Sequence, residues 1–273
     1  MGLNNPDAPK GFAVLQSDGV FQSKRTIGTA YAGQRKVTGR YAYIQTQGCP
    51  IKKLQNVLAQ HCVRFIGTHD PFTPTDVAVA IDEGDLASSA AIVRGGRARG
   101  LEPRNVWGVN YGEEDATIAA MAASASTQGL CGDARGDARG VTVKLGDLAV
   151  VVHDIPMATG RFVYVDGCAS ATVLAESGVI QAAIYRLRRS ALCALTLVFS
   201  HHDASLFRAA SPSLAVLALV LKTAMKANLD AEITYLLRYR GSMVYIQFLL
   251  GPADASFDSV AARLRTDNLS VEA

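Results

Sequence analysis

Acidic residues are missing from a long stretch near the start of the chain, since none occurs between Gly19 and His69. Eight basic and five aromatic residues lie within that stretch. A segment with one sign of charge cannot neutralise itself locally, so it faces either water or a negatively charged partner. We expect these basic residues, and three arginines farther along, to contact an anionic partner: Lys24, Arg25, Arg35, Lys36, Arg40, Lys52, Lys53, Arg64, Arg94, Arg97 and Arg99.

Charged residues are also scarce in the chain as a whole, at 19%, where a quarter is usual. Those present are segregated along the sequence. Residues 1–69 hold nine basic and two acidic residues, whereas residues 70–137 hold five basic and eleven acidic ones. Opposed blocks of this kind can pair within one molecule or head-to-tail between molecules, which gives rings or shells. The low charge content therefore favours a subunit that covers part of its surface with neighbours.

The short motifs of the commonest enzyme classes are absent. The sequence has no Gly-x-Ser-x-Gly, no phosphate loop ending in Gly-Lys-Ser or Gly-Lys-Thr, no Gly-x-Gly-x-x-Gly and no Cys-x-x-Cys. It also lacks any uninterrupted run of eighteen apolar residues, so no membrane-spanning helix is expected. We therefore expect a protein that is not an enzyme of these classes and has no membrane span.

Cysteine is present five times, at no regular spacing, which does not indicate a disulfide framework. An odd number leaves at least one free thiol in the monomer, as is usual in a reducing compartment. The first residues include polar Asn4 and Asn5 instead of a basic and then apolar leader. We expect the protein in the cytoplasm or in an assembled particle, and not secreted through a signal peptide.

The densest group of possible metal ligands is Cys49, His61, Cys62 and His69. Zinc prefers four such donors, and a structural zinc could stabilise a small module here. The spacing Cys-x11-His-Cys-x6-His lacks the two close pairs that are typical of zinc folds. Cys62 also lies on the apolar side of its expected helix, which fits a buried free thiol equally well. Zinc is therefore a possible cofactor, and no other is indicated.

His-Asp dipeptides form a second constellation, and two of them follow apolar runs that we expect to be strands. These are His153-Asp154 and His202-Asp203, the second preceded by His201. Strand ends are common places for metal and acid–base sites. If they converged, His153, Asp154, His201, His202 and Asp203 could hold a divalent metal and activate water for hydrolysis. The same residues also fit plain polar positions at the start of loops.

The chain divides at the Gly-rich segment Ser126–Gly140, which contains a tandem Gly-Asp-Ala-Arg and an Arg135-Gly136-Asp137 tripeptide. We expect a less regular basic and acidic region over residues 1–130 and an α+β sandwich domain over 140–273, with helices packed on a mainly antiparallel sheet. The expected strands are 40–45, 77–81, 106–111, 141–145, 148–153, 162–165, 193–199, 233–239 and 243–250. The expected helices are 52–64, 113–124, 171–189, 213–226 and 257–264.

The composition and charge pattern favour a non-enzymatic structural subunit, such as a virus coat (capsid) or similar shell protein, that works through repeated contacts with copies of itself or another structural protein. A nucleic-acid-binding protein is the first alternative, because cations with interleaved aromatics in residues 19–69 suit phosphates and bases, with Arg94–Gly100 as a flexible cationic loop. A metal-dependent hydrolase built on the His-Asp pairs is the second alternative.

Overall fold

A single seven-stranded sheet runs through the computed structural model, which describes residues 50–82, 86–110, 140–146, 148–200, 212–239, 243–254 and 256–272. The strand order across the sheet is β3-β2-β1-β4-β5-β7-β6. The strands are β1 (Val77–Ile81), β2 (Val106–Asn110), β3 (Thr142–Leu145), β4 (Gly160–Ser170), β5 (Cys193–Ser200), β6 (Asp230–Tyr239) and β7 (Met243–Gly251).

The sheet is mostly parallel. Strands β1 to β5 pair in parallel, and only β7 runs antiparallel to its neighbours β5 and β6. The expected mixture of helices and sheet is confirmed, but the expected antiparallel arrangement is wrong. The cause is the apolar run that begins at Leu148, which we expected to be a strand over 148–153 and which forms helix α7 instead. A short apolar run cannot by periodicity alone be assigned to strand or helix.

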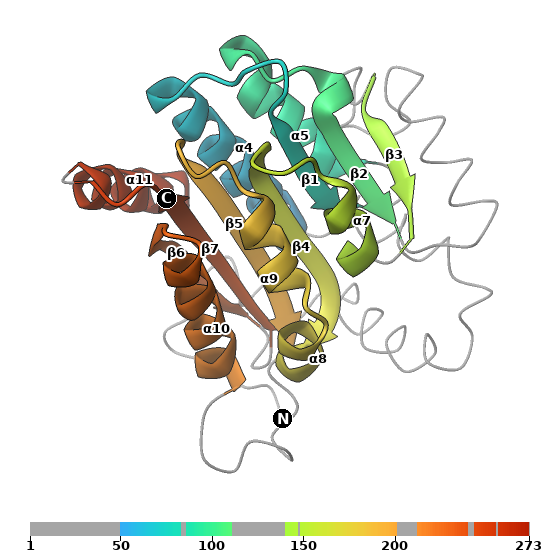
Figure 1. Ribbon diagram of the computed structural model, residues 1–273, viewed down its shortest axis with the longest axis vertical. Helices are drawn as coiled ribbons and strands as arrows, with labels where there is room; N and C mark the ends of the chain where they lie inside the picture. Colours follow the sequence, from blue (N-terminus) through green and yellow to red (C-terminus); the bar gives the residue numbers. More distant parts are fainter. Residues whose placement is uncertain are drawn as a thin grey trace.

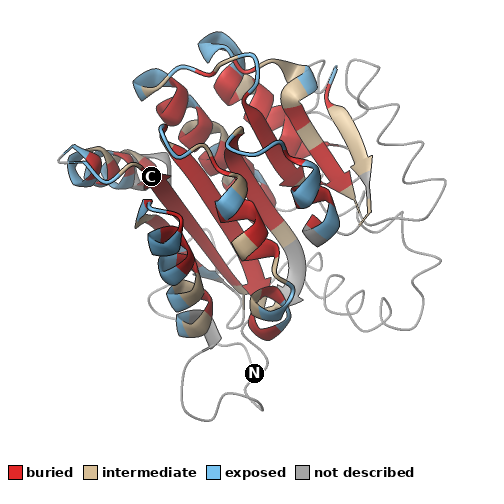
Figure 2. Ribbon diagram, in the orientation of Figure 1, coloured by how far each residue is buried: buried red, intermediate tan, exposed pale blue. Residues whose placement is uncertain are grey.

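Helices cover both faces of the sheet (Figure 1). One face carries α4 (Pro50–His69), α5 (Ala87–Gly96) and α11 (Phe257–Glu272), whereas the other carries α7 (Leu148–Asp154), α8 (Ala171–Glu176), α9 (Val179–Arg186) and α10 (Pro212–Lys226). Two short 3-10 turns, η2 (Arg97–Arg99) and η3 (Pro103–Asn105), lead into β2. Figure 2 shows the central strands buried along most of their length, as expected for strands covered on both faces.

Several expected elements are confirmed close to their expected positions, among them β1, β5, α10 and the β6–β7 hairpin. The single helix expected over 171–189 is two helices, because Gly178 between them adopts a left-handed backbone (φ 77°). The flexible loop expected at Arg94–Gly100 is wrong as well. Its residues complete α5 and form η2, and Gly95 and Gly96 are buried. The elements expected at 40–45 and 113–124 and the tripeptide at 135–137 lie outside the described residues.

The expected division at about residue 130 falls between two strands of one sheet. Strand β1 lies between β2, which precedes that point, and β4, which follows it. The described residues on either side of that point, within 50–110 and 140–272, therefore share one sheet and two hydrophobic cores. Within the described ranges, no helix is both long enough and apolar enough to cross a membrane.

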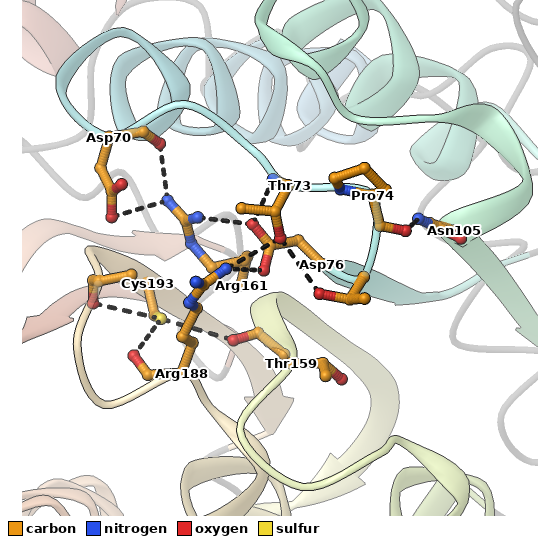
Figure 3. A network of polar contacts seen from close by, with 12 residues as sticks. Asp70, Thr73, Pro74, Asp76, Asn105, Thr159, Arg161, Arg188 and Cys193 are labelled. Atoms are coloured by element: carbon orange, nitrogen blue, oxygen red, sulfur yellow. Dashed lines mark hydrogen bonds and ion pairs between the residues drawn. The ribbon is translucent and has the colours of Figure 1, made fainter.

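A buried ionic network joins the strands where β1 and β4 begin (Figure 3). The fully buried Arg161 donates from Nη1 to Oδ2 of Asp76 at 2.8 Å and from Nη2 to the carbonyl of Asp70 at 2.8 Å. Arg188 donates to the other oxygen of Asp76 at 2.8 Å, and this contact raises the pKa of Arg188. Because charges this deeply buried are costly without partners, the network is a structural clamp at the amino edge of the sheet.

Candidate functional site

The carboxyl ends of β1 and β4 form the point at which the winding of the sheet reverses. From β1 the chain proceeds outward to β2 and β3, and then crosses back to place β4 on the other side of β1. In open α/β sheets, ligands bind in the crevice outside the carboxyl ends of the strands at such a switch point. The candidate site is therefore at this edge, opposite the Arg161 network.

Asp82 directly follows β1 and fixes the start of helix α5. Its Oδ1 accepts a hydrogen bond from the backbone N–H of Ser88 at 3.0 Å, and its Oδ2 accepts one from that of Ser89 at 2.6 Å. Burial raises the pKa of Asp82, while these bonds and the charge of Lys52 act in the opposite direction. Asn110, the last residue of β2, donates from Nδ2 to the carbonyl of Asp82 at 2.8 Å. The ends of β1, β2 and α5 are thus held together by one carboxylate and one amide.

Lys52 and Asp166 form an ion pair on the β4 side of the switch point. Lys52 belongs to the first turn of α4, and Asp166 follows the buried part of β4, so the fold joins residues 114 positions apart. Their side chains are only 9% and 4% exposed. A carboxylate near a helix N-terminus is also favoured by the helix dipole. The pair brings one cation and one anion, both largely desolvated, to the candidate site.

Tyr164 and Gln55 extend this pair into the core. The Lys52 ammonium lies 5.4 Å from the centroid of the Tyr164 ring, within the range of a cation–π contact. The Tyr164 hydroxyl donates to Oε1 of Gln55 at 3.3 Å, and both residues are buried. The four side chains therefore form one connected polar group between α4 and β4.

Three buried polar side chains near the start of α4 and α5 have no hydrogen-bond partner among the described residues. They are the hydroxyls of Ser88 and Ser89, in the first turn of α5, and the carboxamide of Asn56 on α4. Buried polar groups are nearly always hydrogen-bonded in native proteins, so an orphaned group often indicates a bound water, ion or ligand. Ser88 is more informative than Asn56, because it adjoins the Asp82 turn at the switch point.

The expected zinc ligands do not come together. Cys62 is fully buried in the core, and burial raises its pKa. His61 contacts Asn268 at 3.1 Å through Nδ1, and His69 contacts the carbonyl of Phe65 at 3.0 Å, while Cys49 lies outside the described residues. No group of three or more possible ligands occurs in the described ranges. The expectation of zinc is therefore wrong, because the helical positions of these residues point to different neighbours.

The basic residues expected to meet an anionic partner occupy different surroundings. Lys52 is buried in its ion pair, and Arg94 donates to Gln60 at 3.2 Å. The others that are described are exposed: Lys53, Arg64, Arg97 and Arg99. Five lie outside the described residues: Lys24, Arg25, Arg35, Lys36 and Arg40. Except at Lys52 and Arg94, whose partners are internal, the expected anionic contact stays a prediction.

The His-Asp pairs are not assembled in the described part of the chain. His153 and Asp154 are exposed in the last turn of α7, which is a helix and not a strand, so they do not lie at a strand end. His201, His202 and Asp203 lie outside the described residues. The structure therefore provides no converged histidine site for the proposed hydrolase.

Two carboxylates of this site carry a sequence signal, although neither was among the expected site residues. Asp82 directly follows the apolar strand VAVAI, and Asp166 directly follows FVYV. A carboxylate immediately after a buried strand is a typical candidate for the carboxyl edge of a parallel sheet. Lys52 was noted only as one cation among many, because a sequence pattern does not reveal that its partner is Asp166.

No family model and no curated protein matches the chain, whereas a comparison with solved structures finds similar folds. Cofactor-bound Rv0187 from MTB is 20% identical over 70% of this chain and 78% of its own, with a TM-score of 0.42. Trm1 from Pyrococcus horikoshii with S-adenosyl-L-methionine is 11% identical (79% and 58% covered, TM-score 0.46). The O-methyltransferase from Bacillus cereus in complex with SAH is 11% identical (85% and 89% covered, TM-score 0.45). At these values the likeness concerns the fold alone.

The strand order and the parallel pairing of β1 to β5 are those of a Rossmann-like α/β sheet. The expectation of a non-enzymatic virus coat or shell subunit is wrong: the similar structures named above are solved with a bound cofactor, which in two of them is S-adenosyl-L-methionine or SAH, and none of them is a capsid protein. The low charge content that suggested a shell subunit has a simpler origin: a sheet buried on both faces requires long apolar strands.

Proposed function

We propose that the chain is an S-adenosylmethionine-dependent methyltransferase whose cofactor binds at the carboxyl edge of β1 and β4. The observation that carries this proposal is the pair of carboxylates, Asp82 and Asp166, on either side of the switch point, together with Lys52. Support for the identity of the cofactor comes from similar folds solved with S-adenosyl-L-methionine and SAH.

The residues on the β1 side fit such a ligand. S-adenosylmethionine carries a sulfonium and an ammonium group, and two carboxylates against one lysine leave this edge acidic. The Ser88 hydroxyl is a buried polar atom without a partner among the described residues, at the helix turn that Asp82 holds in place. Asp82 and Asn110 would shape the turn, and Ser88 would offer a hydrogen bond to the bound molecule.

The residues on the β4 side suit the methyl acceptor. When bound, the cofactor supplies an electrophilic methyl group. Lys52 places an ammonium group at this edge, where it can donate a hydrogen bond to an acceptor oxygen or nitrogen and orient its lone pair. Asp166 holds that ammonium group through the ion pair. Orientation of reacting groups alone can supply a large part of a rate enhancement.

Equilibrium dialysis of the full chain with radiolabelled S-adenosylmethionine tests the proposal. We expect saturable binding of S-adenosylmethionine that SAH displaces and NAD does not. S-adenosylmethionine and NAD both suit Rossmann-like sheets, but only the sulfonium and ammonium groups of S-adenosylmethionine suit the acidic edge formed by Asp82 and Asp166. Asp82→Asn should weaken binding roughly tenfold, the effect of losing one charge-assisted contact at the turn.

Asp258→Asn is the matched control, since Asp258 is an exposed carboxylate in the first turn of α11, at the opposite edge of the sheet. We expect it to bind the cofactor as the wild type does. Absence of saturable binding by the wild-type chain, or displacement by NAD in place of SAH, would overturn the proposed function.

A further inference from the structure

We infer that Tyr164 is a positioning residue for Lys52, and that Gln55 fixes the Tyr164 ring in that role. The inference deepens the proposed function and depends on it, since Lys52 is the group that would meet the methyl acceptor. It concerns the two members of the polar group that lie behind the ion pair, away from the edge of the sheet.

The four residues meet in two pairs because the residue spacing along α4 brings two side chains opposite two side chains of β4. Lys52 and Gln55 are three residues apart and lie on the same side of α4. Tyr164 and Asp166 are two residues apart and lie on the same face of β4. Each helix residue thus faces one strand residue: Lys52 pairs with Asp166, and Gln55 bonds to Tyr164. The fold holds the two contacts side by side.

A single ion pair does not fix a lysine side chain, because its flexible stem leaves the ammonium group free to turn about the carboxylate. The Tyr164 ring supplies a second contact from another direction, 5.4 Å from Nζ to the ring centroid. Tyr164 is fully buried, and its hydroxyl is bonded to Gln55 at 3.3 Å, so the ring is held in its orientation. The ammonium group is therefore confined between Asp166 and the ring.

An aromatic face is suited to this task because it attracts the cation without adding a full negative charge. A second carboxylate in place of the ring would compete with the acceptor for the ammonium hydrogens. The ring thus orients the Lys52 ammonium group without neutralising its positive charge.

Competitive labelling of lysine amines with acetic anhydride, read by mass spectrometry across a pH series, tests the inference on the full chain. Lys53 is the internal control, since it is the next residue on α4 and is exposed. In Tyr164→Leu we expect the labelling of Lys52 relative to Lys53 to rise about three- to tenfold, and to begin at lower pH, because one contact with the protonated form is lost.

Two milder variants keep the test decisive if Tyr164→Leu does not fold. Tyr164→Phe and Gln55→Leu both remove the hydroxyl bond and keep a ring next to Lys52, so a smaller rise of the same sign is expected. Unchanged labelling of Lys52 in every folded variant, with S-adenosylmethionine binding intact, would overturn the positioning role alone. Failure of the wild-type chain to bind S-adenosylmethionine would instead overturn the proposed function and, with it, this role of Lys52.

Discussion

Buried charges at the amino edge and at the carboxyl edge of the sheet have different roles. At the amino edge, Arg161 and Asp76 are fully buried and satisfied by several partners. At the carboxyl edge, Lys52 and Asp166 retain slight exposure. A closed network contributes to a single folded state, whereas a group at a partly open edge remains able to meet a ligand.

Replacing Arg161 tests the closed network. Arg161→Met should lower the free energy of unfolding by about 3–5 kcal/mol, because it leaves Asp76 buried without one of its two cationic partners. Arg265→Met is the control, since Arg265 meets Glu232 at 3.5 Å with both side chains about half exposed, and such pairs contribute at most about 1 kcal/mol. Urea unfolding of the three proteins gives the comparison. Equal losses in the two variants would contradict the structural role of the network.

At the scale of elements, the sequence placed several strands and helix α10 well, and it assigned one short apolar run wrongly. The apolar runs of β1 and β5 and the longer apolar stretch of α10 form the elements expected from them. The apolar run at Leu148–Val152 fitted both a strand and a helix, and it packs against the sheet as helix α7. The direction of each strand was not predictable either, since parallel pairing depends on where the crossover helices return the chain.

The close crossing of α4 and α5 provides a test at this scale. A Cβ on Gly95 would lie 2.3 Å from the carbonyl oxygen of Gln60, so the two helix backbones touch there. Gly95→Ala would stabilise an isolated helix by about 1 kcal/mol, yet here it should destabilise the protein by about 1–3 kcal/mol because the helices must separate. Thermal unfolding by circular dichroism measures the sign. A gain in stability would show that the helices do not cross this closely.

The carboxylates of the candidate site could be predicted from the sequence, whereas the ion pair could not. Carboxylates after buried strands, such as Asp82 and Asp166, follow a local pattern that a reader can find. The pairing of Lys52 with Asp166 is not local, because it depends on α4 crossing the end of β4. For the same reason Lys52 was grouped with exposed cations: charge is visible in a sequence, whereas burial is a property of the assembled fold.

At the scale of the whole molecule, one sheet links both halves of the chain. Strand β1 has β2 on one side and β4 on the other, so neither half contains a complete sheet. We therefore expect fragments 1–130 and 140–273, made separately, to lack a cooperative unfolding transition, while the intact chain unfolds in one step. Circular dichroism during urea titration tests this. Cooperative unfolding of fragment 140–273 alone would show that it is an independent domain.

The position of β1 also has a consequence for synthesis of the protein. The ribosome completes β1 at Ile81 but reaches its inner neighbour β4 only at Gly160. At a synthesis rate of roughly 5–20 residues per second, the side of β1 that pairs with β4 stays unpaired for on the order of ten seconds. During that time the backbone N–H and C=O groups on that side of β1 are unpaired and open to other strands. The nascent chain is thus most prone to aggregate before β4 emerges, and slower translation over this interval would lengthen the exposure.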